Sequence, residues 1–186
     1  MNPTGIIKPE DTVFVMVDIQ ERLAPVIHNI AQVISNSNIL IKSSRILDIP
    51  LIVTEQYPRG LGKTCGEIKF PENFDSKDLI EKTHFSCFGC DEFVKKLNET
   101  GARSIVLFGI EAHVCILKTA LDALENNFDV HVVADAAGSR TPENLSTAIE
   151  RMRQSGAFIV STEMIIFQLI EKSATVEFKM ISKLVK

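Results

Sequence analysis

The chain has 186 residues, 45% of them hydrophobic and 24% charged, a composition typical of one soluble globular domain over residues 1–186. The formal net charge of -4, without a dense Lys/Arg cluster, argues against a nucleic-acid partner or an anionic membrane surface. Apolar runs fall short of the roughly 20 residues that span a bilayer, and the N-terminus lacks the pattern of a signal peptide. We therefore expect a cytoplasmic protein with no nucleic-acid or membrane partner.

Strand-like and helix-like segments alternate along the chain. In the first half, apolar patterns predict a strand at 12–18, a helix at 29–48, a strand at 50–55, a long loop at 56–76, a strand at 78–83 and a helix at 90–101. In the second half, they predict strands at 103–109, 129–135 and 157–162, alternating with helices at 113–127, 141–156 and 163–172. Thr141 and Pro142 suit the N-cap and first position of the helix at 141–156.

This alternation predicts a parallel sheet covered by helices on both faces. Right-handed crossovers then favour an α/β fold of the three-layer α/β/α, doubly wound type, with six strands in the order 3-2-1-4-5-6. The amphipathic residues 174–186 could pack on this domain or on another subunit.

Three reactive residues lie at the predicted carboxyl ends of strands, where ligands bind in such folds. Asp18 ends the first strand, Lys82 ends the third, and Cys115 follows the fourth at the start of a helix. Taken singly, each has an ordinary alternative as a turn residue, a solvated lysine or a small buried apolar residue. Because all three fall on one predicted rim, the combination is more specific than its parts.

These three residue types suit nucleophilic catalysis. The thiolate is the nucleophilic form of cysteine, and a helix N-terminus and a nearby lysine should both favour it. A carboxylate such as Asp18 can accept the thiol proton as general base. We therefore expect Cys115 to attack an electrophilic carbon, with main-chain N–H groups between Gly109 and Cys115 holding the developing oxyanion.

Cys87 and Cys90 form the only C-x-x-C pattern in the chain. A zinc site would call for a second such pair, which the sequence lacks. The open alternatives are a thioredoxin-like redox pair and incidental thiols in a reducing compartment, and the second is the ordinary case.

The segments "VMVDIQERL", "VTEQYPRGLG", "EKTHFSCF", "GIEAHVCI", "DAAGSR" and "STEMIIFQLI" resemble the isochorismatase-like cysteine hydrolases. The resemblance implies Asp18 as base, Lys82 as electrostatic partner and Cys115 as nucleophile. It also implies a non-proline cis peptide bond at Ile110–Glu111, with the N–H groups of Glu111 and Cys115 forming the oxyanion hole. The Glu111 side chain would then not be catalytic.

Within this superfamily, "TEQYPRGLG" looks like the YcaC-like or isochorismatase-domain-containing branch. Nicotinamidases carry an Asp-x-His pattern after the second strand and further histidines that bind a metal, whereas this chain has "TEQYP" after that strand, without His. We expect no metal and no cofactor, although ligation of a metal by His84 or His113 is an alternative. A true isochorismatase cleaves a vinyl ether and needs no cysteine nucleophile, so Cys115 argues against that activity.

Five further residues follow or flank the strand ends, and we expect them to contact the substrate. For each of them, packing or loop anchoring is an equal alternative. They are Gln20, Gln56, Tyr57, Phe85 and His113.

The leading hypothesis is a metal-independent cysteine hydrolase that acts on a small amide or a related C–N or ester-like bond through a thioester-type intermediate. The alternatives are a binding or scaffold protein that has lost the chemistry, a vinyl-ether hydrolase, and a thiol sensor that uses Cys87 and Cys90. The partners we expect are a small-molecule substrate and further copies of the chain in a homo-oligomer.

Overall fold

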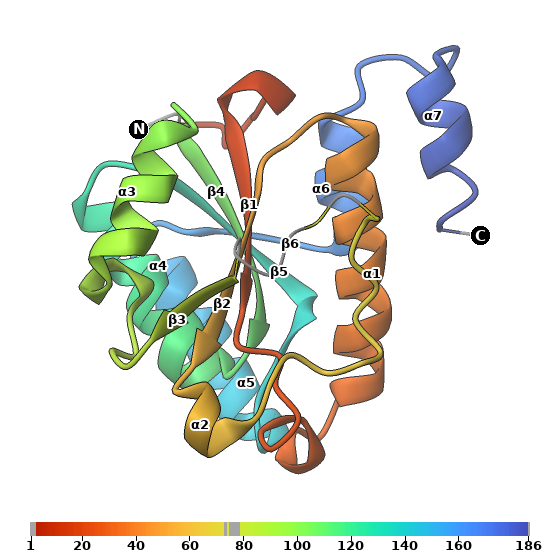
Figure 1. The fold of residues 1–186 in the computed structure, drawn as a ribbon. Coiled ribbons are helices and arrows are strands. Elements are labelled where there is room, and N and C mark those ends of the chain that lie inside the picture. Colours follow the sequence, from red (N-terminus) through yellow and green to blue (C-terminus); the bar gives the residue numbers. More distant parts are fainter. Residues whose placement is uncertain (1–2, 73, 75–78, 186) are drawn as a thin grey trace.

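The computed structural model describes residues 3–72, 74 and 79–185. Within these residues, a six-stranded parallel sheet has the order β3-β2-β1-β4-β5-β6, which confirms the predicted fold and strand order (Figure 1). The strands are β1 (Thr12–Val17), β2 (Leu51–Gln56), β3 (Leu79–Lys82), β4 (Ser104–Ile110), β5 (Asp129–Gly138) and β6 (Phe158–Val160).

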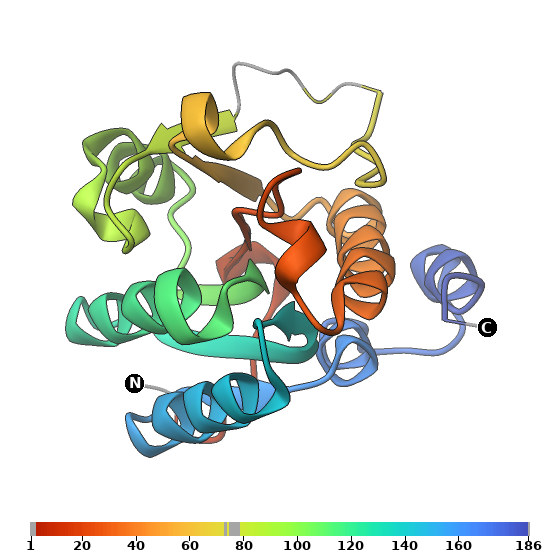
Figure 2. The ribbon, with the colours of Figure 1, turned by 90° about the horizontal axis from the view of Figure 1, so that it is seen from below.

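Helices cover both faces of the sheet, so the three layers are also confirmed (Figures 1 and 2). One face carries α1 (Ile30–Ile46) and α6 (Thr162–Gln168), and the other carries α3 (Asp91–Glu99), α4 (Leu117–Glu125) and α5 (Pro142–Gln154). The C-terminal α7 (Val176–Ile181) packs on α1 and buries Ile181. Among the described helices, none combines the length and the apolar character that crossing a bilayer requires.

Each face of the sheet has its own apolar core, as the alternation of side chains along a strand dictates. All six residues of β1 are buried. Phe14 and Met16 face the core beneath α1, whereas Val13 and Val15 face the core beneath α3 and α4. This burial on both faces explains why β1 reads as a continuous apolar run.

The structure differs from the predicted elements mainly at their ends. The predicted strand at 129–135 continues to Gly138, because the end of β5 pairs with the end of β4. A single helical turn, α2 (Pro58–Leu61), lies inside the segment 56–76 that we predicted to be a loop. Positions 73 and 75–76 of that loop, and 77–78 at the predicted start of the third strand, lie outside the described residues.

The predicted capping of α5 is confirmed. Thr141 Oγ1 accepts a hydrogen bond of 3.1 Å from the N–H of Asn144, and Pro142 is the first helical residue.

Gly109 allows β1 and β4 to approach closely where both strands end. It pairs with Val17 and has a φ of 122°, a conformation that L side chains rarely adopt. A Cβ atom at this position would lie 2.1 Å from the Val17 carbonyl oxygen. This contact brings the segment after Val17 against the segment after Gly109, where the candidate site lies.

Candidate active site

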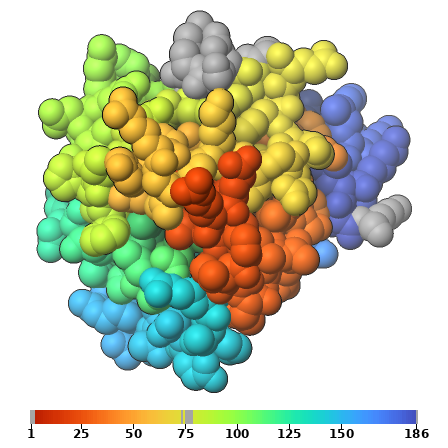
Figure 3. Space-filling view, turned by 60° about the horizontal axis from the view of Figure 1, so that its bottom comes forward, coloured from red at the N-terminus to blue at the C-terminus, as the bar shows by residue number. Residues whose placement is uncertain are grey.

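The carboxyl ends of the parallel strands lie at the lower end of the sheet in Figure 1. Figure 3 turns this end toward the viewer, with the segment after β1, in red and orange, between the segment after β2, in yellow-orange, and the segment after β5, in cyan. Loops from distant parts of the sequence therefore meet on this face, as expected for a doubly wound sheet.

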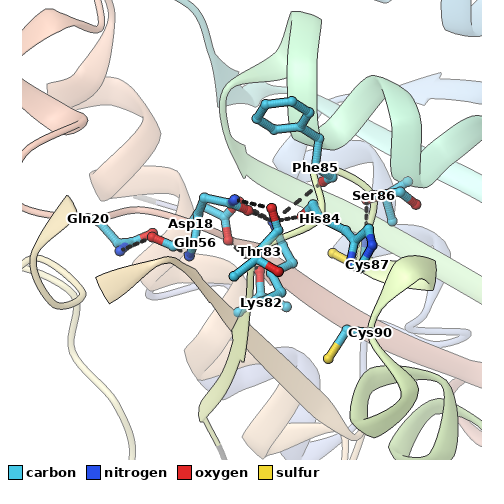
Figure 4. Close-up of polar contacts among 12 residues, drawn as sticks. Asp18, Gln20, Gln56, Lys82, Thr83, His84, Phe85, Ser86, Cys87 and Cys90 are labelled. Carbon is cyan, nitrogen blue, oxygen red and sulfur yellow. Dashed lines mark hydrogen bonds and ion pairs between the residues drawn. The ribbon is translucent and has the colours of Figure 1, made fainter. Parts of the chain in front are cut away.

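Asp18 and Lys82 form a fully buried ion pair at this end of the sheet (Figure 4). Lys82 Nζ lies 2.7 Å from Asp18 Oδ2, and the other carboxylate oxygen accepts a 2.7 Å hydrogen bond from Thr54 Oγ1. The two residues meet because Val17 pairs with Thr54 and Gln56 pairs with Lys82 across adjacent strands. A φ of 52° turns the chain out of β1 at Asp18.

Lys82 is held from several sides. Its Nζ donates to Gln56 Oε1 at 2.7 Å and faces the carbonyl oxygens of His84 at 3.3 Å and Phe85 at 3.4 Å. Burial lowers the pKa of Lys82, but the negative charge of Asp18 and the nearby thiol groups outweigh it, so the pKa rises above its usual value. The ammonium group therefore stays charged and compensates the buried carboxylate.

Cys115 completes the cluster. It is 6% exposed, and its thiol hydrogen-bonds to Asp18. Burial raises the pKa of Cys115 well above its usual value; the charge of Asp18 raises it further, and Lys82 lowers it only in part. Lys82 therefore favours the thiolate, as we expected, but burial and then the charge of Asp18 outweigh this effect and favour the neutral thiol in the resting site.

The turn that carries Cys115 is a π turn rather than the first turn of an α-helix. Residues Ala112–Ile116 form it, and the N–H of Ile116 donates to the carbonyl oxygen of Glu111 at 3.3 Å. The preceding peptide bond, between Ile110 and Glu111, is cis. The α-helix α4 begins only at Leu117. Cys115 therefore lies in the π turn before α4 and not in the first turn of the helix that we predicted at 113–127.

Gln20 and Gln56 hold the site together instead of facing an open pocket. Both are buried. Gln20 Nε2 donates to the carbonyl oxygens of Gln56 and Gly62, and its Oε1 accepts from the N–H of Gln56 at 2.7 Å. Gln56 Nε2 donates to the carbonyl oxygen of Thr83. Their amides serve protein groups, so this geometry does not support the predicted contact with substrate.

Tyr57 and Phe85 are the exposed aromatic residues beside the ion pair, at 53% and 56%. The carbonyl of Phe85 faces Lys82 while its ring extends away from it (Figure 4). Tyr57 borders a depression of about 430 Å³ at the β3 edge of the sheet. Among the described residues, those lining this depression include Lys82 but neither Asp18 nor Cys115, so it adjoins the site without containing it.

A second polar cluster adjoins the π turn. Arg140 Nε donates to Glu111 Oε1 at 2.6 Å, and His113 Nδ1 lies 3.0 Å from Ser139 Oγ. We predicted no role for Ser139 or Arg140 from the sequence. The segment "DAAGSR" that contains them was a usable signal, because it follows a predicted strand at the same rim.

Cys87 is buried, and the charges of Asp18 and Lys82 both act on its thiol, whereas Cys90 is only partly buried. The N–H of Cys87 donates to Thr119 Oγ1 at 3.0 Å. Burial, followed by the charge of Asp18, raises the pKa of the Cys87 thiol to about 12, so this thiol is poorly suited to exchange. Both thiols are free, and Cys90 occupies the N-cap position of α3 without a side-chain capping hydrogen bond. A redox role for the pair stays a hypothesis.

The described part of the chain has no group of three or more His, Cys, Asp or Glu side chains arranged to hold a metal ion. His84 is exposed, and His113 is bonded to Ser139. The polar atoms around Asp18 are those of an ammonium, a hydroxyl and a thiol, a set suited to moving protons.

Comparison with known sequences gives consistent matches over the whole chain. The isochorismatase domain model matches residues 12–164. The secreted isochorismatase effector Isc1 of Phytophthora sojae is 40% identical over 185 residues, which cover 98% of this chain and 88% of that protein. Isochorismatase domain-containing protein 1 of Danio rerio is also 40% identical, over 183 residues; the match covers 98% of this chain and spans 63% of the relative's length.

Comparison with solved structures also gives matches over most of the chain. The MAR1 ribonuclease from Caenorhabditis elegans has a TM-score of 0.88 and 38% identity, over 96% of this chain and 91% of that chain. The YcaC gene product from Escherichia coli, an octameric hydrolase of unknown specificity, has a TM-score of 0.85 and 22% identity, over 96% and 89% of the two chains. The second likeness concerns the fold alone.

Proposed function

Because the chain belongs to the isochorismatase domain family, we propose that it is a cysteine hydrolase acting on a small amide or a related C–N or ester-like bond. One observation carries the proposal. The Asp18 carboxylate is hydrogen-bonded to both the Lys82 ammonium and the Cys115 thiol, although the three residues come from the ends of three different strands. A carboxylate between a thiol and a fixed cation can take up and return a proton.

In the first half-reaction, the thiol proton passes to Asp18 as the Cys115 sulfur attacks the carbonyl carbon of the substrate. The carbonyl π bond opens, and the oxygen takes up negative charge within reach of the N–H groups of Glu111 and Cys115. The C–N bond then breaks, and Asp18 returns the proton to the leaving amine. A thioester on Cys115 remains.

In the second half-reaction, Asp18 takes a proton from a water molecule, and the resulting hydroxide attacks the thioester. The C–S bond breaks, a carboxylic acid leaves, and the proton returns to the Cys115 sulfur. Lys82 stays charged throughout and limits the energy of moving charge in a buried site. Each step uses only groups of this chain and water, so neither a metal nor a cofactor is required.

Three of the predicted substrate contacts stay in the proposal. Tyr57 and Phe85 have exposed rings and contact Lys82 through their main-chain groups, and His113 lies in the turn that carries Cys115. The exposed rings of Tyr57 and Phe85 suit a small organic substrate or a neighbouring subunit. We retain the homo-oligomer and the cytoplasmic location as further proposals.

The structural relative from Caenorhabditis elegans is called a ribonuclease, which makes RNA cleavage the second candidate. The net charge of -4 does not favour it, because RNA binding rests largely on cationic contacts with phosphates. The buried Lys82 is committed to Asp18, and Arg140 is committed to Glu111. The remaining alternatives are a vinyl-ether hydrolase, a binding protein without turnover, and a thiol sensor that uses Cys87 and Cys90.

The test is a panel of small amides, carbamates, imides and esters, with a vinyl ether and a short RNA added, screened against the wild type, Cys115→Ala and Cys115→Ser. We expect turnover of a C–N or ester-like compound that falls by about 10³-fold or more in both variants, because the thioester cannot form. Trapping of the acyl group on Cys115 by mass spectrometry is the second readout.

Cys65→Ala is the matched control. Cys65 is also 6% exposed, but it packs in the core on the other face of the sheet. It should retain turnover. Full turnover by Cys115→Ser would exclude the nucleophile role, and cleavage of RNA or of the vinyl ether alone would establish the corresponding alternative.

A further inference from the structure

The residue whose main-chain N–H would enter the oxyanion hole carries a negative charge. Glu111 follows β4 directly, and its side chain is only 11% exposed. A carboxylate buried to this degree needs compensating partners. These partners come from the end of β5, because Ile110 pairs with Gly138 and so places the residues after Gly138 beside Glu111.

Arg140 supplies the main compensation. Its Nε lies 2.6 Å from Glu111 Oε1, and its Nη2 lies 3.4 Å from Oε2, so the two planar groups meet as a fork. The hydrogen bond and the charge of Glu111 raise the pKa of Arg140. The Arg140 side chain is 55% exposed, so its guanidinium remains hydrated while it holds a largely buried carboxylate.

A second contact holds the same turn. His113 Nδ1 lies 3.0 Å from Ser139 Oγ, and His113 Nε2 lies 3.9 Å from Glu111 Oε1. Ser139 is fully buried and next to Arg140 in the chain. The segment after β5 therefore holds the turn before Cys115 at two points, residues 111 and 113.

The charge of the Glu111 side chain affects the oxyanion of the proposed reaction. An uncompensated carboxylate on Glu111 would repel the oxyanion that the N–H of the same residue has to stabilise. We propose that Arg140 is a positioning residue for the oxyanion hole: it fixes Glu111 and cancels the charge of its side chain. This inference rests on the proposed cysteine hydrolase function.

The test separates the reactivity of the thiol from the stabilisation of the oxyanion. Iodoacetamide alkylates Cys115 with loss of iodide and forms no oxyanion. Propionaldehyde adds to Cys115 reversibly: a C–S bond forms, the carbonyl π bond opens, and the thiol proton passes by way of Asp18 to the former carbonyl oxygen. That oxygen occupies the place of the oxyanion. Bound aldehyde protects Cys115 from iodoacetamide, and mass spectrometry measures the alkylated fraction. The dependence of this fraction on the aldehyde concentration gives the aldehyde Kd.

For Arg140→Ala, we expect the aldehyde Kd to rise about 10-fold, because the hole is misplaced and faces an unpaired charge. Alkylation of Cys115 without aldehyde should change less than about two-fold, since Asp18 and Lys82 are untouched. In Arg140→Ala with Glu111→Gln, the Kd should return to within about three-fold of the wild type, because the unpaired charge is gone. A purely structural role of Arg140 predicts no such rescue.

Arg153→Ala is the matched control, since Arg153 is 54% exposed and pairs with Glu150 on α5. It should change neither quantity. If Arg140→Ala does not fold, as judged by circular dichroism, Arg140→Lys replaces it; we expect its Kd to rise about three-fold, because lysine keeps the charge but not the fork.

Two outcomes overturn the inference: an aldehyde Kd in the Arg140 variant equal to that of the Arg153→Ala control, or a double variant no better than Arg140→Ala. Failure of the proposed function looks different. In that case, neither reagent would modify Cys115 of the wild type in preference to Cys65 or Cys90, and the inference would fall with it.

Discussion

Two buried titratable side chains of the same sheet, Asp18 and His131, are accommodated in opposite ways. At the carboxyl ends of the strands, the Asp18 carboxylate is compensated by an ion pair with Lys82 and by hydrogen bonds from Thr54 and the Cys115 thiol. Within β5, by contrast, His131 is 1% exposed, and neither ring nitrogen has a hydrogen-bond partner among the described residues. The first region contains a compensated charge, and the second contains a group that stays neutral.

The two regions also differ in their capacity to take up a proton. His131 stacks on Phe158, with ring centroids 5.0 Å apart, and burial lowers its pKa to about 4. It behaves as a flat, mainly apolar side chain that cannot take up a proton near neutral pH. The Asp18 cluster can redistribute a proton without losing its charge balance. Burial alone therefore does not suit a titratable group to proton transfer; partners that compensate its charge are also required.

The largest expected effect comes from removing the cation of the first region. Lys82→Met leaves the Asp18 carboxylate buried without a counter-charge. We expect the free energy of unfolding to fall by about 3–5 kcal/mol and turnover to disappear. Urea unfolding followed by circular dichroism measures the first effect, and the substrate assay measures the second.

The matched variant removes both charges. Lys82→Met with Asp18→Asn should be more stable than Lys82→Met alone and should still lack turnover, because no uncompensated charge remains but the base is gone. If the single variant were as stable as the wild type, the ion pair would not compensate a buried charge as we describe.

Acid should lower the contribution of the second region, around His131, to the free energy of unfolding. The pKa of His131 is lowered from its usual 6.5 to about 4, so the unfolded chain binds this proton more readily than the folded chain does. The contribution of neutral His131 is therefore fully present above pH 6.5 and declines as the pH falls toward 4, by at most about 3 kcal/mol. Unfolding free energies measured at half-unit pH steps test this slope.

His131→Phe provides the comparison variant, because it retains a flat ring against Phe158 without a titratable group. Its unfolding free energy should depend less on pH between 6.5 and 4 than that of the wild type. Equal slopes in the two proteins would assign the acid sensitivity to other residues.

The smallest effect concerns the hydroxyl that orients the base. Thr54→Val removes the 2.7 Å hydrogen bond to Asp18 Oδ1 at nearly constant volume. We expect a loss of about 1–2 kcal/mol of unfolding free energy and a several-fold fall in kcat, since Asp18 loses one of its fixed partners. Thr54→Ser keeps the hydroxyl and should lie closer to the wild type in both measurements. A kcat of Thr54→Val equal to that of the wild type would contradict an orienting role.

The fold could be predicted from the sequence because the patterns that indicate its strands and helices are local and repeated. Apolar runs such as the one from Val13 to Val17 mark strands buried on both faces, and Thr141 with Pro142 marks a helix start. Alternation of strands and helices then restricts the topology to few choices. Element ends were less accurate, because pairing such as that of Ile110 with Gly138 depends on a neighbouring strand.

By itself, the sequence determined the class of fold, the strand order and the three residues Asp18, Lys82 and Cys115 at one rim, because parallel strands bring their carboxyl ends to the same side. Only the tertiary structure decided the protonation balance of Cys115 and the burial of Gln20. It alone paired Glu111 with Arg140. These features depend on distances and on exclusion of water between segments far apart in the chain, and residue order does not specify either quantity.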